Sequence, residues 1–566
     1  MNENIVKSKE NRRKIYISLL VTVICLIGLT YALFTIFLKQ TENNSLATRT
    51  CFSTSLTEET SKITLDKAYP LTHEKGLETT PFTFKLTNNC DKPVKVYITI
   101  DSTYRTSTSS SYLSDSYIRE NINLKGETTA PSVILTEQTL KEIDNGNQGY
   151  VIKETWLEAN EEKEYDLRLW MDESVTVEQG LNKTWKGSVV VSAVAETKLP
   201  TWDNPEDGTL LAAIKRDNTV KSPSTTPGSA ISADTEALLA STEDDYGTSY
   251  YFRGAVTNNF VEYANMCWRI VRVTGDSSIK LVLYNYNGLT STNNTPSSNT
   301  PCNVTGDDYA LARYEGDTYT SVFNSSYNDN AYVGLMYGTA GASSYADAHA
   351  NTNPSTILTN LNKWYTNVLS KQANFSDSQL SDTIWCNDKS VVTDTTFNPG
   401  NYTLGTNYGY AKNISYYSAT KRLVQASSYK AGGTGTSLIC PSDNYGGKLS
   451  KFTVSDTEYG NGALKNYAKI GILTVDEIAF AGGAAYTTKS TYYLKENTNS
   501  NYWWVLSPGS VGGTGANVWG VNGAGILANG NISYGLGVRP SLSLQSGVKI
   551  SSSGIGSATN PYKIAV

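Results

Sequence analysis

The sequence predicts a multidomain protein with an N-terminal transmembrane helix, an all-β sandwich domain and a C-terminal α+β domain. Three features lead to this prediction: a long uncharged segment near the N-terminus, alternating apolar and polar residues after it, and mixed helical and strand patterns in the second half. The chain of 566 residues is long enough for several domains, since one domain takes roughly 100–200 residues.

The composition indicates a folded protein without a nucleic-acid partner. Charged residues make up 18% of the chain and aromatic residues 11%, including 38 tyrosines, which is more aromatic surface than disordered chains carry. The formal net charge is −6, whereas binding to nucleic-acid phosphates needs a basic surface. We therefore expect no nucleic-acid binding.

Residues 15–38 contain no charged side chain and are long enough to cross a membrane. At about 1.5 Å per residue, a helix of this length spans a hydrocarbon core of roughly 30 Å. Residues 1–14 hold five basic residues, and the positive-inside rule places them in the cytoplasm. The alternative, a cleaved signal peptide, would have a shorter apolar region followed by a small-residue cleavage site. We expect a single-pass cell-membrane protein that contacts lipid through residues 15–38, with its C-terminus outside the cell.

The cysteines that follow this segment agree with export. They form an even set: Cys51, Cys90, Cys267, Cys302, Cys386 and Cys440. Local pairing within the apparent domains predicts three disulfides, Cys51–Cys90, Cys267–Cys302 and Cys386–Cys440. The alternative is a zinc site, but no C-x-x-C spacing occurs and the chain has two histidines, His73 and His349. We expect no metal and no cofactor.

Residues 45–197 show the alternation that half-buried strands require. The stretches FTFKLTNNC, VKVYITI, EYDLRLWM and GSVVVSAVA alternate apolar and polar residues. Short strands of this kind, with turn residues between them, predict a β-sandwich of immunoglobulin-like build. Residues 198–246 are richer in Pro, Ser and Thr, so we expect a linker or an extended segment there.

Residues 247–566 combine strands, helices and long loops. CWRIVRV and IKLVLYNY, separated by a turn, predict a hairpin. Pro354 to Gln372 has apolar residues on one face at helical spacing, with Asn360 and two lysines facing away. A second, short helix is predicted in TVDEIAFAGG, where Thr474 and Glu477 have capping-box spacing and two glycines end the helix.

Several stretches in this half occur together in a known kind of domain. MCWRIVRVTGD, LNKWYTN, IGILTVDEIAFAGG, YWWVLSP and GVRPSLSL resemble a family of extracellular domains in surface proteins of low-GC Gram-positive and gut bacteria. The last two stretches resemble the C-type-lectin-like fold, which formylglycine-generating enzymes share. Residues 45–197 resemble the β-sandwich that often precedes it. The resemblance implies a C-type-lectin-like domain at 247–566 and a cell-surface location; it implies no activity.

The residues themselves offer little catalytic chemistry. Neither histidine has a Ser or Cys nucleophile near it in the sequence, and Cys386 and Cys440 have a simpler role as a disulfide. We expect no enzyme activity. The acidic pairs Asp244–Asp245 and Asp307–Asp308 are candidates for calcium ligands, with solvated loop carboxylates as the alternative. Arg539 is expected to close the domain by binding carbonyls or a carboxylate, with an anionic ligand as its alternative partner.

The stretch from Asn501 to Leu544 opens on paired tryptophans and closes on an apolar strand pattern, yet it holds ten glycines between Trp503 and Pro540. Gly, Ser, Asn and Tyr are typical of adaptable binding loops. We therefore expect a rigid frame that displays a ligand-binding surface. The candidate ligand-binding residues are Ser510, Thr514, Asn517, Trp519, Asn522, Asn529, Asn531, Ser533 and Tyr534. The alternative is that the glycines only form tight turns in a twisted sheet.

Taken together, these features predict a membrane-anchored surface protein whose head binds an extracellular protein or glycan. C-type-lectin-like domains with this terminal arrangement resemble the targets of diversity-generating retroelements, whose mutagenesis of asparagine codons yields Ser, Gly and Tyr. The resemblance thus implies that residues 505–537 are diversified. The alternative function is a structural envelope or self-assembling surface protein without an external ligand.

Overall fold

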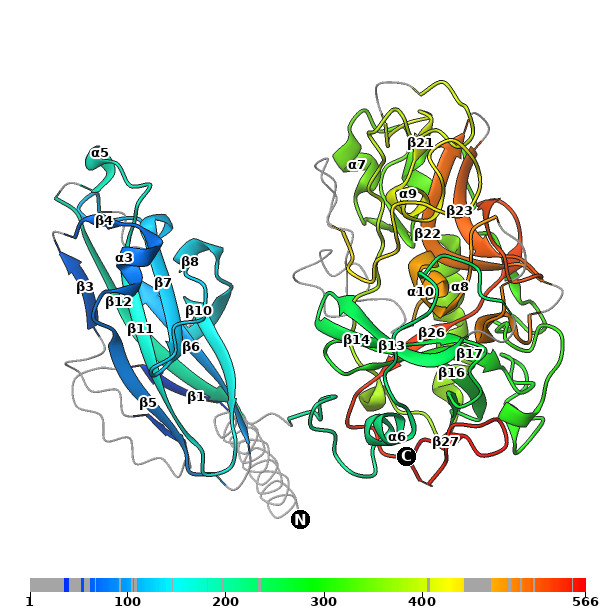
Figure 1. Cartoon of the computed structure of the whole chain (residues 1–566), viewed down its shortest axis with the longest axis horizontal. Helices are drawn as coiled ribbons and strands as arrows, with labels where there is room; N and C mark the ends of the chain where they lie inside the picture. The colour runs from blue at the N-terminus through cyan, green and yellow to red at the C-terminus, as the bar shows by residue number, and fades with distance from the viewer. Residues whose placement is uncertain are drawn as a thin grey trace, which may run out of the picture. The chain divides into compact units, whose positions relative to one another are not determined.

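The structure is a computed structural model whose chain forms two compact units, Met1–Lys198 and Leu199–Val566 (Figure 1). It describes residues 35–39, 52–54, 62–66, 68–90, 93–102, 105, 109–144, 146–180, 182–194, 198–232, 236–404, 408–441, 470–486, 490–498, 501–512, 515–551 and 553–565.

Two sheets build the first unit. The described strands of one sheet are, in spatial order, β1 (Thr35–Lys39), β12 (Thr184–Val194), β6 (Val94–Ser102), β10 (Asn147–Leu157) and β9 (Leu140–Asp144), with β3 (Lys62–Asp66) also beside β12. Those of the other sheet are β2 (Phe52–Thr54), β5 (Phe82–Asn88), β11 (Glu162–Asp172), β7 (Ile118–Leu124) and β8 (Val133–Ile134), with β4 (Pro70–Leu71) beside β11. Two short helices, α3 (His73–Leu77) and α5 (Val177–Gly180), connect strands.

One hydrophobic core holds these two sheets together. In β6 the side chains of Val96, Ile98 and Ile100 are buried while Lys95 and Tyr97 are half-buried, as period-two alternation requires. These three residues pack in one cluster with Leu86 of β5 and other residues of the second sheet. The prediction of a β-rich first domain is therefore confirmed.

The predicted membrane helix lies mostly outside the described residues. Its last four residues, 35–38, are described, and they differ from the prediction because they lie in strand β1, which pairs antiparallel with β12. Thr, Ile and Phe in this stretch are residue types that favour strands. Among the described residues, no helix has the length and apolar character needed to cross a membrane.

The second unit also contains two large sheets. One consists of β13 (Ala237–Asp244), β14 (Gly247–Gly254), β16 (Met266–Val273), β15 (Phe260–Tyr263) and β27 (Tyr562–Lys563), with β17 (Ile279–Asn285) between β16 and β26 (Ser541–Leu544). The other consists of β18 (Thr320–Ser321), β25 (Leu536–Gly537), β22 (Trp503–Gly512), β23 (Gly515–Val521) and β24 (Leu527–Asn531), with β21 (Ser415–Tyr416) beside β22. A two-stranded ribbon pairs β19 (Met336–Tyr337) with β20 (Asn353–Pro354).

Helices connect and support these sheets. The described α-helices of this unit are α6 (Leu210–Asp217), α7 (Tyr345–His349), α8 (Thr356–Asn367), α9 (Ser418–Leu423) and α10 (Val475–Ala481). The described 3-10 helices of the chain are η1 (Asp115–Tyr117), η2 (Leu135–Glu137), η3 (Pro301–Asn303), η4 (Asn330–Tyr332), η5 (Leu369–Lys371), η6 (Asp377–Gln379) and η7 (Tyr493–Lys495). Helix α10 contacts β14 of one sheet and β22 of the other (Figure 1).

Both helices predicted in this half are present. Helix α8 is shorter than predicted because Val368 leaves the helical conformation. Asn360 does not face solvent as expected: it is buried and its amide donates to the Ser321 hydroxyl at 2.7 Å. Helix α10 has the predicted capping box between Thr474 and Glu477, and it ends at Gly482, whose φ of 125° suits glycine.

The segment expected as a linker packs within the second unit, which begins at Leu199. Helix α6 buries four apolar side chains, Leu210, Leu211, Ala213 and Ile214. Strand β13 pairs with β14 along its whole length. Ser, Thr and Pro are abundant in the loops between these elements. Their abundance made the short apolar stretches of α6 and β13 difficult to recognise in the sequence.

Two of the three predicted disulfides are confirmed, Cys267–Cys302 and Cys386–Cys440. The first links β16 to η3, and the second links two loops of the second unit. The third prediction, Cys51–Cys90, stays a prediction because Cys51 lies outside the described residues.

Candidate functional site

The glycine-rich stretch forms an antiparallel sheet of β22, β23 and β24. Trp503 and Trp504, the paired tryptophans at its start, are both fully buried in the main hydrophobic cluster of the unit. Arg539 is also fully buried and donates to the carbonyls of Leu283 (2.9 Å) and Leu494, as the sequence predicted. The frame around this sheet is therefore buried and hydrogen-bonded.

A row of polar residues crosses the three strands in register. Ser510 of β22 pairs with Asn517 of β23, and Asn517 pairs in turn with Asn531 of β24. The side chains of Asn517 and Asn531 are half-buried, whereas Ser510 is 7% exposed. Three residues that are far apart in the sequence thus become neighbours through strand pairing.

The turn after β24 continues this row towards solvent. The Asn531 carboxamide oxygen accepts from the backbone N–H of Ser533 at 3.0 Å and from its hydroxyl at 2.8 Å. This fixes the turn that presents Tyr534, whose side chain is 59% exposed. Tyr327, which is 43% exposed, lies against Gly515 beside Asn531. We refer to these six residues, Ser510, Asn517, Asn531, Ser533, Tyr534 and Tyr327, as the polar face.

Three other candidate ligand-binding residues lie outside the polar face, and two of them have structural roles. Trp519 is fully buried, and its indole N–H donates to the Thr420 hydroxyl at 3.1 Å. Asn522 caps the β23–β24 turn, because its side-chain oxygen accepts from the N–H groups of Ala524 and Ile526, both at 2.9 Å. Asn529 has a buried carboxamide oxygen without a hydrogen-bond partner. Thr514 lies outside the described residues.

Close packing explains two of the glycines. A Cβ atom on Gly509 would lie 2.3 Å from the carboxamide oxygen of Asn529 on β24. A Cβ atom on Gly515 would lie 2.8 Å from the Asn531 amide nitrogen and 2.9 Å from the Tyr327 ring. Both distances are too short for a side chain, so glycine lets neighbouring side chains lie against the strands.

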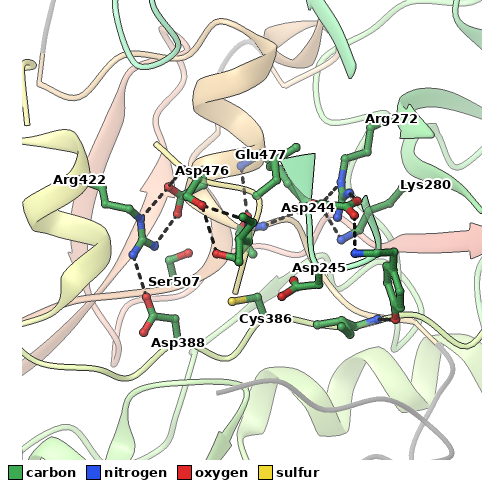
Figure 2. Close-up of a pocket in the computed structure, with 16 residues that line it drawn as sticks. Asp244, Asp245, Arg272, Lys280, Cys386, Asp388, Arg422, Asp476, Glu477 and Ser507 are labelled. Atoms are coloured by element: carbon green, nitrogen blue, oxygen red, sulfur yellow. Dashed lines mark hydrogen bonds and ion pairs between the residues drawn. The ribbon is translucent and has the colours of Figure 1, made fainter. Parts of the chain in front are cut away.

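Helix α9 connects this sheet to a buried charged cluster. On one side, the Thr420 hydroxyl donates to the Gly509 carbonyl at 2.7 Å, and the Tyr417 N–H donates to the same carbonyl at 3.1 Å. On the other side, the guanidinium of Arg422 forms a bidentate pair with Asp476 at 2.9 and 2.7 Å and also contacts Asp388 at 3.0 Å (Figure 2). The charges therefore fix the helix that holds β22.

Glu477 of α10 is the centre of the second half of the cluster (Figure 2). Its carboxylate accepts from Lys280 at 2.7 Å and from Arg272 at 3.0 Å, and its other oxygen accepts from the Thr474 N–H at 3.0 Å. Burial alone would raise the pKa of Glu477, but the two cations and these hydrogen bonds lower it to about 2. The carboxylate is therefore ionised at neutral pH.

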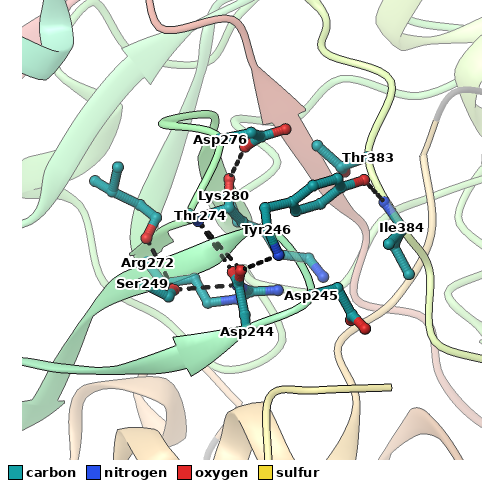
Figure 3. A network of polar contacts seen from close by, with 12 residues as sticks. Asp244, Asp245, Tyr246, Ser249, Arg272, Thr274, Asp276, Lys280, Thr383 and Ile384 are labelled. Atoms are coloured by element: carbon teal, nitrogen blue, oxygen red, sulfur yellow. Dashed lines mark hydrogen bonds and ion pairs between the residues drawn. The ribbon is translucent and has the colours of Figure 1, made fainter. Parts of the chain in front are cut away.

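Asp244 completes the cluster from the end of β13 (Figure 3). It accepts from the Arg272 guanidinium, from the Tyr246 N–H at 2.8 Å and from the Gly275 N–H at 3.1 Å. The side chain is 7% exposed. The sequence suggested that Asp244 is either a calcium ligand or a solvated loop carboxylate. Neither suggestion fits, because Asp244 is a buried anion that is already paired with Arg272.

The cavity between these groups is too small for an organic substrate. Its volume is about 30 Å³, which is the space of about one water molecule. Ser507 lines it, and the hydroxyl oxygen of Ser507 accepts from the Val475 N–H at 3.0 Å in the first turn of α10. The arrangement can hold elements in place, and it offers no space in which a substrate would meet the serine.

The candidate metal ligands and histidines form no cluster in the part of the chain that the structure describes. Among the described residues, no group of three or more His, Cys, Asp or Glu side chains could hold a metal ion. His349 is fully buried and its ring nitrogen Nε2 contacts the Gly409 carbonyl at 2.6 Å. Asp308 contacts the amide of Asn501.

Sequence reasoning missed most of the charged cluster. It identified Glu477 only as a helix cap, and it gave no role to Arg272, Lys280 or Arg422. A signal was present: Arg272 and Lys280 interrupt strands β16 and β17, in which every residue is buried. Charged residues are almost never buried without partners, so a buried strand pattern that contains them predicts an ion pair.

Comparison with known families gives one match. A family model described as a domain of unknown function (DUF6273) matches residues 362–546, about a third of the chain. The matched residues include α9, α10 and strands β22 to β24. A search of curated proteins gave no match. This part of the chain is therefore similar to a domain family for which the description names no function.

Proposed function

We propose that this protein is a binding protein of the cell surface and that the polar face of the second unit contacts its ligand. The observation that carries the proposal is the register of β22, β23 and β24, which aligns Ser510, Asn517 and Asn531 in one row. Two exposed tyrosines, Tyr327 and Tyr534, flank this row. Tyrosine provides contact area at low entropy cost, and Asn and Ser provide adaptable hydrogen bonds.

The rigid support of this face favours binding. The polar residues Ser510, Asn517 and Asn531 belong to strands β22 to β24, which also contribute buried tryptophans to the core, and α9 ties β22 to the charged cluster. A binding surface on a rigid frame loses less conformational entropy when it engages a ligand. The glycines at 509 and 515 allow the close packing on which this rigidity depends.

The location outside the cell is part of the proposal. Two disulfides in the second unit suit an oxidising compartment, and the uncharged residues 15–34, which precede β1, would anchor the chain with its basic N-terminus inside. We further propose that the first unit is an immunoglobulin-like spacer and that the second is C-type-lectin-like. A retroelement that diversified residues 505–537 would vary Asn517, Ser533 and Tyr534 of the polar face, while the buried Trp503 and Trp504 lie outside this range.

A screen of the full-length chain in a mild detergent tests this function. The purified chain is immobilised and exposed to host glycans, mucins and bacterial surfaces, and light scattering of the same preparation follows self-association. The proposal expects saturable binding to at least one of these targets. Concentration-dependent ordered assembly without binding to any target would contradict it and would favour the structural alternative.

A further inference from the structure

Another cavity of the second unit shares no lining residue with the polar face or with the cavity of the charged cluster. Its volume is about 530 Å³, within the range of roughly 300–1,000 Å³ that small-molecule sites occupy. Phe260, Tyr284 and Ala558 line its apolar part, and Glu496 and the hydroxyls of Thr257 and Thr305 line its polar part. Both threonines are exposed.

A buried arginine joins the walls of this cavity. The guanidinium of Arg269 lies 3.8 Å from the centre of the Phe260 ring and 5.5 Å from that of Tyr284. It donates to Glu496 at 2.6 Å and to the carbonyl of Val256, the residue before Thr257, also at 2.6 Å. One fully buried side chain therefore fixes the aromatic rings, the carboxylate and the threonine wall relative to one another.

A tight turn forms the remaining wall. The N–H of Asn560 donates to the Ser557 carbonyl at 3.1 Å, and the Phe260 N–H donates to the Gly556 carbonyl at 2.8 Å. Gly556 has a φ of 72°, and a Cβ atom there would lie 2.3 Å from the Asn258 carbonyl. This glycine lets the turn with Ser557 and Ala558 approach the start of β15.

We propose that this cavity binds a neutral saccharide. The carboxylate of Glu496 is paired with Arg269, so the site presents little net charge to a ligand. The lining offers groups that suit a sugar: hydroxyls that donate and accept, a carboxylate that accepts, and a small apolar surface from the half-buried Ala558 and the mostly buried rings of Phe260 and Tyr284. The Cys267–Cys302 disulfide packs with Phe260 and Tyr284 and stabilises the arrangement of the lining residues in the absence of a ligand.

The test uses saturation-transfer difference NMR on the full-length chain in a mild detergent. The probes are the methyl glycosides of glucose, galactose, mannose and N-acetylglucosamine. Thr305→Trp fills the cavity with an indole, and Thr257→Val removes one hydroxyl without changing the side-chain shape. Thr366→Trp, at an exposed threonine of α8, is the matched control.

We expect saturation transfer to at least one glycoside, its loss in Thr305→Trp, and its retention in Thr366→Trp. Thr257→Val should weaken the affinity about 2- to 10-fold, the effect of one lost hydrogen bond. No transfer to any of the four glycosides would overturn the proposal, as would undiminished transfer in both cavity variants. Because the polar face is separate, replacing Asn517 and Tyr534 by Ala should leave these signals unchanged, so the two proposals can fail independently.

Discussion

At the scale of single residues, Gly509 sets how closely β22 approaches the side chains of β24. The space that a side chain would need at this position is already filled by the Asn529 carboxamide, 2.3 Å from the position of a Cβ atom. The carboxamide oxygen is buried and has no hydrogen-bond partner. A side chain at position 509 would therefore force the Asn529 carboxamide to shift within a packed site.

Gly509→Ala should destabilise the second unit by about 1–3 kcal/mol, the cost of overpacking a filled site. Urea unfolding followed by tryptophan fluorescence measures this change. Gly512→Ala is the matched control on the same strand, because its Cβ atom would meet only the Tyr402 hydroxyl, at 4.0 Å. Equal stability of the two variants would contradict the packing that we describe.

Glu477→Gln should lower the unfolding free energy by about 3–5 kcal/mol at pH 7, since it leaves two buried cations without their shared carboxylate. The folded-state pKa is lowered from 4.5 to about 2, so this stabilisation is present above pH 4.5 and is lost as the pH falls through 2. The difference between wild type and variant should therefore shrink over this range.

Unfolding curves at pH 7, 4 and 2.5 measure that difference. Glu315→Gln is the control, because Glu315 forms an exposed ion pair with Lys363, which contributes at most about 1 kcal/mol. A constant difference between wild type and Glu477→Gln across these pH values would show that the carboxylate is not held ionised by Lys280 and Arg272.

At the scale of elements, α9 and α10 connect the charged cluster to the sheet of β22, β23 and β24. Helix α10 supplies Asp476 and Glu477, and α9 supplies Arg422 to the cluster and Thr420 to β22. The sequence predicted α10 well, because its capping box and final glycine are local signals. It could not predict that α9 links two distant regions, because the partners Asp388 and Gly509 come together only in the fold.

The same contrast between local signals and contacts that form only in the fold explains why the segment 198–246 was predicted to be a linker. Its Pro, Ser and Thr content suggested a linker, whereas α6 and β13 pack in the second unit. Short elements give weak periodic signals, so whether they form depends on the burial of residues such as Leu210 in the tertiary structure.

Trp519 shows why amino-acid composition alone does not identify a binding residue. A tryptophan suits a binding surface, but this one is buried beside Thr420.

Strand β7 of the first unit contains a carboxyl group whose burial should make the sandwich sensitive to pH. Glu120 is 2% exposed; one oxygen accepts from the Gln138 amide at 2.6 Å and the other has no partner. Burial raises its pKa from 4.5 to about 7. Between these values the folded state keeps a proton that the unfolded state has lost, so stability falls as the pH rises from 4.5 to 7.

Glu120→Gln should remove this loss and stabilise the first unit at pH 8 by up to about 3 kcal/mol, as the size of the pKa change implies. Thermal unfolding at pH 4.5 and pH 8 provides the measurement. Glu178→Gln, at an exposed position of α5, should leave both midpoints unchanged. A variant that is no more stable than wild type at pH 8 would refute the raised pKa.

At the scale of the whole molecule, the sequence predicted the β-rich multidomain build, two disulfides and the region of the polar face. Hydrophobic patterns that repeat every two or 3.6 residues are local features of the sequence, so strands and helices can be predicted from them. Cysteines within one domain have few other cysteines with which to pair. The register that brings Ser510, Asn517 and Asn531 together could not be predicted, because it depends on a β-bulge in β22 between Pro508 and Ser510. The sequence identified the three residues individually, and the fold places them in one row.

The measurement that tests the central claim most directly is the dissociation constant of the full-length chain for the target found by the screen. Wild type is compared with Asn517→Ala/Ser533→Ala/Tyr534→Ala on the polar face and with Asn367→Ala/Ser378→Ala/Tyr502→Ala at exposed positions outside it. We predict binding at least 10-fold weaker for the first variant, an unchanged constant for the second, and equal melting temperatures for all three. Equal affinity of wild type and the polar-face variant would contradict the account and place the ligand elsewhere on the molecule.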